Sequence, residues 1–127
     1  MTLAGFLAVG LGAAIGAWLR WWLGIALNPI LPNLPLGTFC ANLIGGYLMG
    51  VALALIVEHD ALSPEMRLLL TTGFLGGLTT FSTFSGEATG LLMRSEYVWA
   101  CALILGHVAG SIAMTFAGFG TMRLVLR

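Results

Sequence analysis

The stretch of sequence that decides the fold of this chain is GFLGGLTTFSTFSGE, which runs from Gly73 to Glu87. It holds two adjacent glycines, a run of hydroxyl side chains, two phenylalanines three residues apart and a carboxylate. Most of it nevertheless lies in the uncharged run 68–86, which hydropathy marks as membrane-spanning. Hydroxyl-rich, irregular backbone is tolerated at membrane depth only where protein buries it or where it lines a cavity. The stretch therefore predicts a pathway or a binding site inside the membrane.

Composition places the rest of the chain in the membrane as well. The 127 residues are 59% hydrophobic and only 8% charged, whereas about a quarter of the residues of a soluble domain are charged. A helix needs roughly 20 apolar residues to cross the hydrocarbon core, and Asn28-Pro29 and the Pro32–Pro35 segment act as stop signals. The sequence thus predicts an all-α integral membrane protein, with one transmembrane domain over residues 1–127 and spans at about 3–22, 37–57, 68–93 and 97–122. The first span lacks a basic leader and a cleavage site, so we interpret it as a helix and not as a signal peptide.

The third span is predicted to be broken near its middle. An unbroken helix over 68–93 would be about 39 Å long, against a core of about 30 Å. Gly76-Gly77 weakens a helix, and the hydroxyls that follow compete for its backbone hydrogen bonds. We therefore expect a break near Gly77–Phe81, which would expose carbonyl groups that suit a cation. The alternative is a glycine kink whose hydroxyls bond back to their own helix.

Other polar residues lie inside the remaining spans. Asn42 follows Thr38 by one helical turn, and it either joins helices or faces a pore. His107, Ser111 and Thr115 form a stripe at i, i+4 and i+8, which suits interhelical hydrogen bonds or a polar track. Glu87 occupies either a central or a vestibule position, since intramembrane carboxylates are usually functional. The inventory is rich in donors without fixed charge, which suits a small anion that must be dehydrated and released.

The charge pattern leaves the orientation open. The chain has no lysine and five arginines. Four spans put both termini and the 58–67 loop on one side with Arg67, Arg123 and Arg127, and leave Arg20 and Arg94 on the other, where we expect them to snorkel to head groups. Three against two is nearly a tie under the positive-inside rule, so the copies insert in one orientation or pair antiparallel. A G-x-x-x-G motif in every span favours tight packing and an oligomer.

Several function classes are excluded. The sequence contains no dinucleotide fingerprint, P-loop or zinc spacing, and we predict that it is not an enzyme. Cys40 and Cys101 both fall inside predicted spans. We interpret them as small buried residues and not as a disulfide or metal pair.

The segment GFLGGLTTFSTFS, residues 73–85, resembles the hallmark of the Fluc or CrcB-type bacterial fluoride channels. PLGTFCANLIG, residues 35–45, resembles that family's second-helix motif, and residues 10–20 resemble its first helix. The resemblance implies a passive, fluoride-selective channel in the bacterial inner membrane that exports toxic fluoride. It also implies an antiparallel, dual-topology homodimer with two pores and a structural sodium ion (Na+) at its centre.

Carried over by position, the resemblance implies roles for single residues. Phe81 and Phe84 match the pore phenylalanines, whose ring edges meet fluoride, and Asn42 matches the pore asparagine. The polar residues assigned to the same route are Thr38, Thr83, Glu87 and Ser111. The positions whose main-chain carbonyls hold sodium are Gly76 and Thr79, and the vestibule arginine is Arg20. Leu103 stands where the family often has a tyrosine.

Two other functions remain as alternatives. A small proton-coupled multidrug exporter also has four spans, but it uses a carboxylate inside the first helix, and this chain has no acidic residue before Glu58. A non-transporting membrane interaction subunit could pack through the G-x-x-x-G faces. Such a subunit would need no broken, donor-lined third helix.

Overall fold

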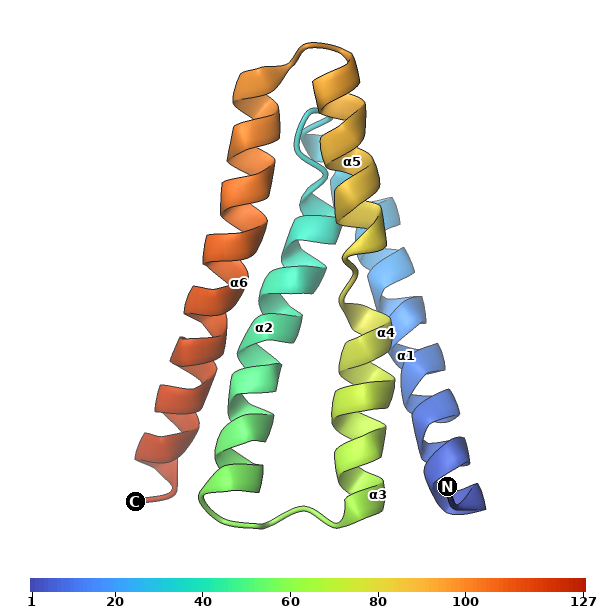
Figure 1. Ribbon diagram of the computed structural model, residues 1–127, viewed down its shortest axis with the longest axis vertical. Helices are drawn as coiled ribbons and strands as arrows, with labels where there is room; N and C mark the ends of the chain where they lie inside the picture. Colours follow the sequence, from blue (N-terminus) through green and yellow to red (C-terminus); the bar gives the residue numbers. More distant parts are fainter.

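The computed structural model describes residues 1–127 and contains helices only, as predicted (Figure 1). The elements in chain order are α1 (Leu3–Leu27), η1 (Asn28–Ile30), α2 (Leu36–Val57), α3 (Pro64–Arg67), η2 (Leu68–Leu75), α4 (Gly76–Leu78), α5 (Ser82–Met93) and α6 (Tyr97–Val125). Segments α3, η2 and α4 follow one another without interruption and form the first half of the third helix; α5 is its second half. Three stretches are long and apolar enough to cross a membrane unaided: Leu3–Ile30, Leu36–Val57 and Tyr97–Val125.

The break in the third helix is confirmed. The first half ends at Leu78, Thr79 is extended (φ −83°, ψ 156°), and α5 begins at Ser82. The Thr79 hydroxyl donates to the Leu75 carbonyl at 2.7 Å, so a hydroxyl does bond back to its own helix. The helix is interrupted all the same, which excludes a simple kink. The residues before it, Leu68–Leu75, are π-helical, a rare geometry that is frequent at functional sites.

The first helix is longer than the predicted span, because it continues through Arg20 to Leu27. Only apolar residues and a glycine follow the arginine before Asn28, and Pro29 then prevents continuation. The Asn28 side-chain oxygen accepts hydrogen bonds from the N–H groups of Gly37 and Thr38, at 2.8 and 3.3 Å. This contact ties the end of α1 to the start of α2.

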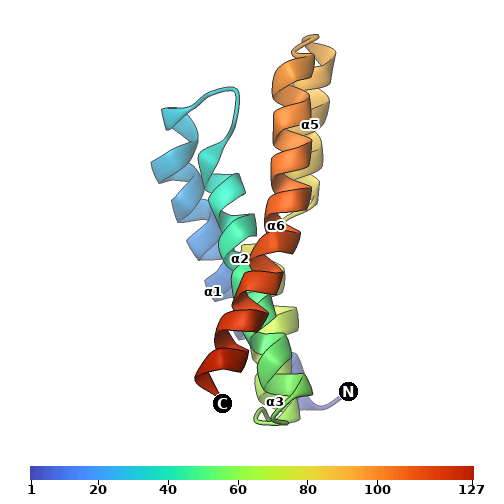
Figure 2. The same ribbon diagram turned by 90° about the vertical axis from the view of Figure 1, so that its left-hand side faces the viewer.

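Figure 1 shows both termini and the loop between α2 and α3 at one end of the molecule, with the α5–α6 connection at the other. This placement agrees with four membrane crossings. In the side view of Figure 2, the α1–α2 hairpin and the α5–α6 hairpin diverge at the end away from the termini.

Glycines bring the helix backbones into contact. A Cβ atom on Gly16 would lie 2.1 Å from the Phe74 carbonyl oxygen, and one on Gly77 would lie 2.3 Å from that of Ala13. A Cβ on Gly50 would lie 2.0 Å from the Thr115 carbonyl oxygen. The G-x-x-x-G prediction is thus confirmed within the chain, where α1 docks on the first half of the third helix and α2 docks on α6.

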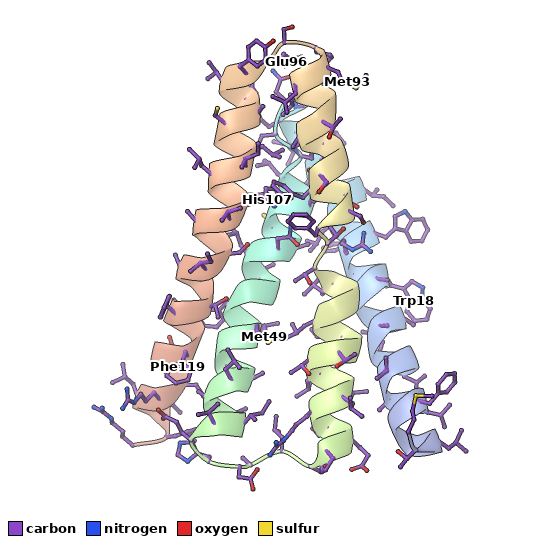
Figure 3. All side chains as sticks on the ribbon, viewed as in Figure 1. Trp18, Met49, Met93, Glu96, His107 and Phe119 are labelled. Carbon is purple, nitrogen blue, oxygen red and sulfur yellow. The ribbon has the colours of Figure 1, made fainter.

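Side chains pack the second half of the third helix. Phe84, Ala88 and Leu91 of α5 form a buried cluster with Ala100 and Leu103 of α6. Leu103 is fully buried, so the position where the family often has a tyrosine belongs to this core. Figure 3 shows Trp18 pointing away from the other helices, in keeping with an exposed fraction of 64%.

Both cysteines are free thiols. Cys40 is half-buried, but Cys101 is exposed, because it faces outward from α6. The expectation that Cys101 is buried was therefore wrong.

Candidate functional site

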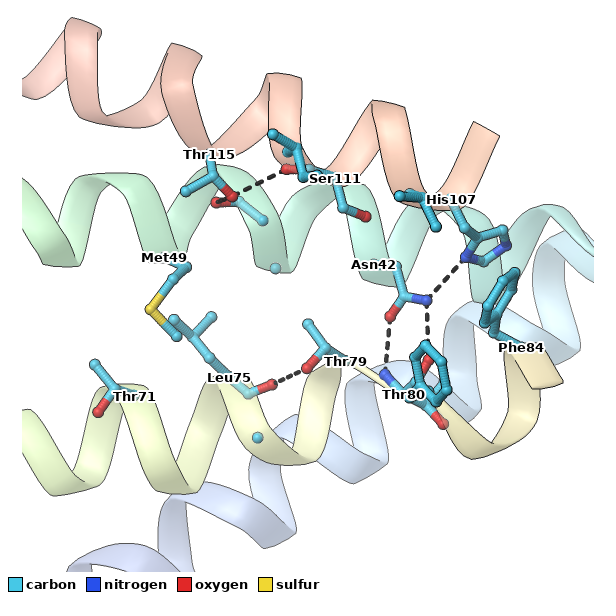
Figure 4. Close-up of a pocket in the computed structure, with 16 residues that line it drawn as sticks. Asn42, Met49, Thr71, Leu75, Thr79, Thr80, Phe84, His107, Ser111 and Thr115 are labelled. Atoms are coloured by element: carbon cyan, nitrogen blue, oxygen red, sulfur yellow. Dashed lines mark hydrogen bonds between the residues drawn. The ribbon is translucent and has the colours of Figure 1, made fainter. Parts of the chain in front are cut away.

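A groove of about 450 Å³ opens beside the break, between α2, the third helix and α6 (Figure 4). The predicted site residues that line it are Asn42, Gly76, Thr79, Phe81, Phe84 and Ser111. The other polar side chains along it are those of Thr71, Thr80, His107 and Thr115. The tertiary structure thus gathers residues that are widely separated in sequence around the break.

Asn42 holds the break open. Its Oδ1 accepts a hydrogen bond from the Thr80 N–H at 2.8 Å, and its Nδ2 donates to the Thr80 carbonyl at 3.0 Å. The same Nδ2 lies 2.9 Å from Nδ1 of His107 on α6. The side chain therefore joins three segments, as the helix-joining interpretation expected, and it also lines the groove.

The two hydrogen bonds between Asn42 and the Thr80 backbone leave the carbonyl oxygens of Gly76 and Thr79 free. In a continuous helix the Thr80 N–H would bond to the Gly76 carbonyl, but here it bonds to Asn42. The carbonyls of Gly76 and Thr79 accept no hydrogen bond within the chain. Hard cations take oxygen ligands, so these two groups fit a sodium ion, whereas no cluster of acidic, His or Cys side chains does.

Arg20 makes a specific contact at the break in the third helix. Its Nε donates to the Gly77 carbonyl at 3.0 Å, at the C-terminal end of the first half of the third helix. A positive charge is favourable there because the helix dipole places partial negative charge at that end. Arg20 thus lies within α1 and not at its end, and its side chain turns inward to the third helix, which the snorkelling expectation did not include.

The two phenylalanines of the motif differ in burial. Their rings meet edge to face, with centroids 5.4 Å apart. Phe84 is 7% exposed, and the centroid of its ring lies 4.8 Å from that of His107. Phe81, in contrast, is 77% exposed. Only Phe84 is packed within the chain, and Phe81 stands at the open side of the groove.

The remaining predicted pore residues, Thr38, Thr83 and Glu87, do not line this groove. A second cavity, of about 460 Å³, is lined by Thr83, Glu87 and Arg94 together with part of the loop after η1. The Thr38 hydroxyl donates to Oε1 of Glu87 at 2.7 Å, while Oε2 is buried without a partner. The predicted set therefore divides into a groove group and a group around Glu87, which favours the vestibule interpretation of that carboxylate.

Sequence reasoning missed the role of Thr80 and did not find the partners of two residues that it had named. Thr80 acts through its backbone, which leaves no signal in side-chain type. Arg94 was expected at the head groups; it pairs with Glu96 at 2.8 Å and also lines the second cavity. His107 was noted in the polar stripe on the fourth span, but its contact with Asn42 depends on how α2 and α6 pack.

Comparison with known proteins gives a consistent result. Residues 7–119 match the family described as CrcB-like protein, Camphor Resistance (CrcB). The chain is 54% identical over 123 residues to a fluoride-specific ion channel FluC of Nitrosospira multiformis, covering 97% of this chain and 96% of the relative. It is 55% identical to the FluC channel of Ralstonia pickettii, an alignment that covers 97% of this chain and 98% of the relative. It is 58% identical to that of Aromatoleum aromaticum, over 93% of this chain and 90% of the relative. These relatives are named as channels and not as enzymes, in line with the sequence prediction.

Proposed function

Because this chain belongs to the CrcB family, we propose that it is a fluoride-selective ion channel that conducts fluoride passively across the bacterial inner membrane. The observation that carries the proposal is identity of about 54% over nearly the whole chain with relatives named as fluoride-specific channels. The groove at the break supports it independently, because its lining residues include no carboxylate.

The groove supplies the donors that a dehydrating anion needs. Fluoride is small and holds water tightly, so closely placed donors must replace its shell. The hydroxyls of Thr71, Thr79 and Thr115 are occupied by backbone carbonyls. The Ser111 hydroxyl makes no hydrogen bond within the chain, which leaves it free for an anion.

The start of α5 adds further donors. The N–H groups of Phe81 and Phe84 have no acceptor within the chain. They lie at the N-terminal end of a half-helix, where the dipole places partial positive charge. The ring edges of the same two residues are also electropositive, so backbone and side chains at this point both favour a negative ion.

We further propose that two copies assemble to complete the site. Free carbonyls beside an open polar groove cannot face hydrocarbon at low energy, and a second copy would cover them. The resemblance implies an antiparallel pair with two pores. The charge balance supports this less than the sequence suggested: with Arg20 held at the break, three arginines near the termini oppose Arg94 alone.

In such a dimer, the Gly76 and Thr79 carbonyls of both copies would hold a sodium ion. These oxygens are free and lie at the negative end of the first half-helix. The ion would fix the two breaks relative to each other. Thr38, Thr83 and Glu87 would form the next part of the route beyond Phe84, with Arg20 contributing positive potential from the far side of the break.

Liposome flux tests the proposal. Purified protein in liposomes loaded with potassium fluoride or potassium chloride, with a potassium ionophore to balance the charge, should release fluoride, and not measurable chloride, with no pH gradient. A proton-coupled exporter would require a pH gradient, and an interaction subunit would give no flux. Equal chloride release, or dependence on a proton gradient, would contradict the channel proposal.

A further inference from the structure

His107 carries a buried polar atom that the fold itself does not use. The residue is 4% exposed, and its Nε2 has no hydrogen-bond partner. The ring packs against two phenylalanines: its centroid lies 5.2 Å from that of Phe39, in an edge-to-face contact, and 4.8 Å from that of Phe84. Buried side-chain polar atoms are nearly always paired, so this exception requires an explanation.

Its neighbours determine which ring nitrogen carries the proton. The Thr80 N–H can only donate, so the atom that it meets on Asn42 must be the amide oxygen. The amide nitrogen of Asn42 is therefore the atom facing His107, and it donates to Nδ1 (Figure 4). An Nδ1 that accepts carries no proton, so the neutral ring has its proton on Nε2. The unpartnered atom is thus an N–H donor.

We propose that the Nε2–H group of His107 donates a hydrogen bond to the permeating anion, and that Asn42 holds the ring in the tautomer that allows it. This inference rests on the proposed channel function. A buried donor without an acceptor is destabilising, and an anion passing Phe84 would supply the acceptor. Because the ring also lines the groove and lies against Phe84, its donor is close to the point where an ion would leave the groove.

The positions of Thr38 and Asn42 along α2 support an anion route past His107. Thr38 and Asn42 are four residues apart, so their side chains lie on one face about 6 Å apart along the axis. Asn42 engages His107, while Thr38 engages Glu87, whose Oε2 is also buried and unpartnered. An anion that moves from Asn42 toward Thr38 leaves the donors of the groove, and the Thr38 hydroxyl ahead of it is already engaged by Oε1 of Glu87 at 2.7 Å. The Nε2–H group would bridge that interval.

Two variants and one spectrum test the inference. H107L removes both ring nitrogens at similar bulk, whereas H107Q restores a neutral N–H donor on a side chain of similar reach. H59Q, in the loop between α2 and α3, changes the only other histidine and serves as the matched control and as the assignment variant. Fluoride flux is measured in liposomes for wild type and all three variants, after each is shown to be monodisperse.

We expect H107L to lose fluoride flux by about ten- to a hundredfold, the usual effect of a hydrogen bond to a charged partner, with H107Q recovering much of it and H59Q unchanged. In histidine-labelled wild-type protein, the 15N spectrum should show His107 protonated at Nε2. Added fluoride should shift that signal, and chloride should not. A ring that only packs, or that holds a structural water, would not give this ion-specific shift.

Both results are required, and where H107L does not fold the fluoride-dependent shift decides alone. A conducting H107L variant, a signal protonated at Nδ1, or a signal that fluoride does not move would each overturn the inference. A wild-type protein that carries no fluoride would instead overturn the channel proposal, so the two failures are distinguishable.

Discussion

The two halves of the third helix are held in different ways. The half from Pro64 to Leu78 docks on α1 through glycines, with backbone against backbone. The half from Ser82 to Met93 docks on α6 through the side chains of Phe84, Ala88 and Leu91. Backbone contact fixes where the carbonyls of the first half end, while side-chain contact fixes where the rings of the second half begin.

The difference matters because the two ends meet within a few residues. The first half ends in free carbonyls at its negative pole, and the second half begins with free N–H groups at its positive pole. One break therefore offers cation ligands on one side and anion ligands on the other. Four predictions test this division, from the largest expected effect to the smallest.

The glycine contacts of the first half should be indispensable. Gly16→Ala places a Cβ 2.1 Å from the Phe74 carbonyl oxygen, a clash with backbone that cannot be relieved by a rotamer change. We expect the variant to yield no monodisperse protein on size-exclusion chromatography. Gly10→Ala in the same helix is the control, because nothing lies within 4 Å of its Cβ. A monodisperse Gly16→Ala protein with normal flux would refute the backbone-docking account.

Asn42→Asp should abolish measurable fluoride flux. The change removes the amide donor that reaches the Thr80 carbonyl and His107, and it places a carboxylate beside the route. Fluoride efflux from liposomes is the measurement. Thr115→Val is a useful comparison, since that hydroxyl already bonds to the Gly46 and Ser111 carbonyls and offers no free donor. If Asn42→Asp conducts as well as Thr115→Val, the groove is not the path.

The phenylalanines should separate stability from flux. Phe84→Ala should lower the free energy of unfolding by about 3–5 kcal/mol, as core phenylalanines do, whereas Phe81→Ala should change it little in one chain because Phe81 is 77% exposed. Phe81→Ile and Phe84→Ile should cripple flux while leaving folded protein, because isoleucine lacks an electropositive ring edge. Thermal unfolding measures the change in stability, and fluoride efflux from liposomes measures the change in conduction. Near-normal rates in both isoleucine variants would return the rings to a packing role.

The smallest effects belong to the proposed cation ligands. Thr79→Ser should be mild, because it keeps both the carbonyl and the hydroxyl that bonds to Leu75 at 2.7 Å. Gly76→Ala should fold as a chain, since its nearest contact would be the Thr71 carbonyl oxygen at 3.8 Å. Any loss in the Gly76→Ala variant should therefore be in the stability of the dimer. Single-molecule photobleaching measures the dimer fraction in sodium and after sodium is replaced by a large organic cation. Equal dimer stability with and without sodium would contradict the cation site.

Much of this protein could be predicted from local sequence. Hydropathy predicted four helical segments, and three of them are long and apolar enough to cross a membrane unaided. Gly76-Gly77 and the hydroxyls after it determined that the third segment would break, since they weaken helix locally. Glycine spacing determined that backbones would touch. The motif itself pointed to Phe81, Phe84 and Asn42.

Only the tertiary structure decided which partner satisfies each polar group. Arg20 reaches the Gly77 carbonyl because α1 packs on the first half of the third helix. Asn42 meets Thr80 and His107 because α2 lies between the break and α6. Such pairings join residues that are distant in sequence, so they depend on how whole helices dock. Local propensity determined where the chain is helical and where it breaks, whereas helix packing decided what the break holds.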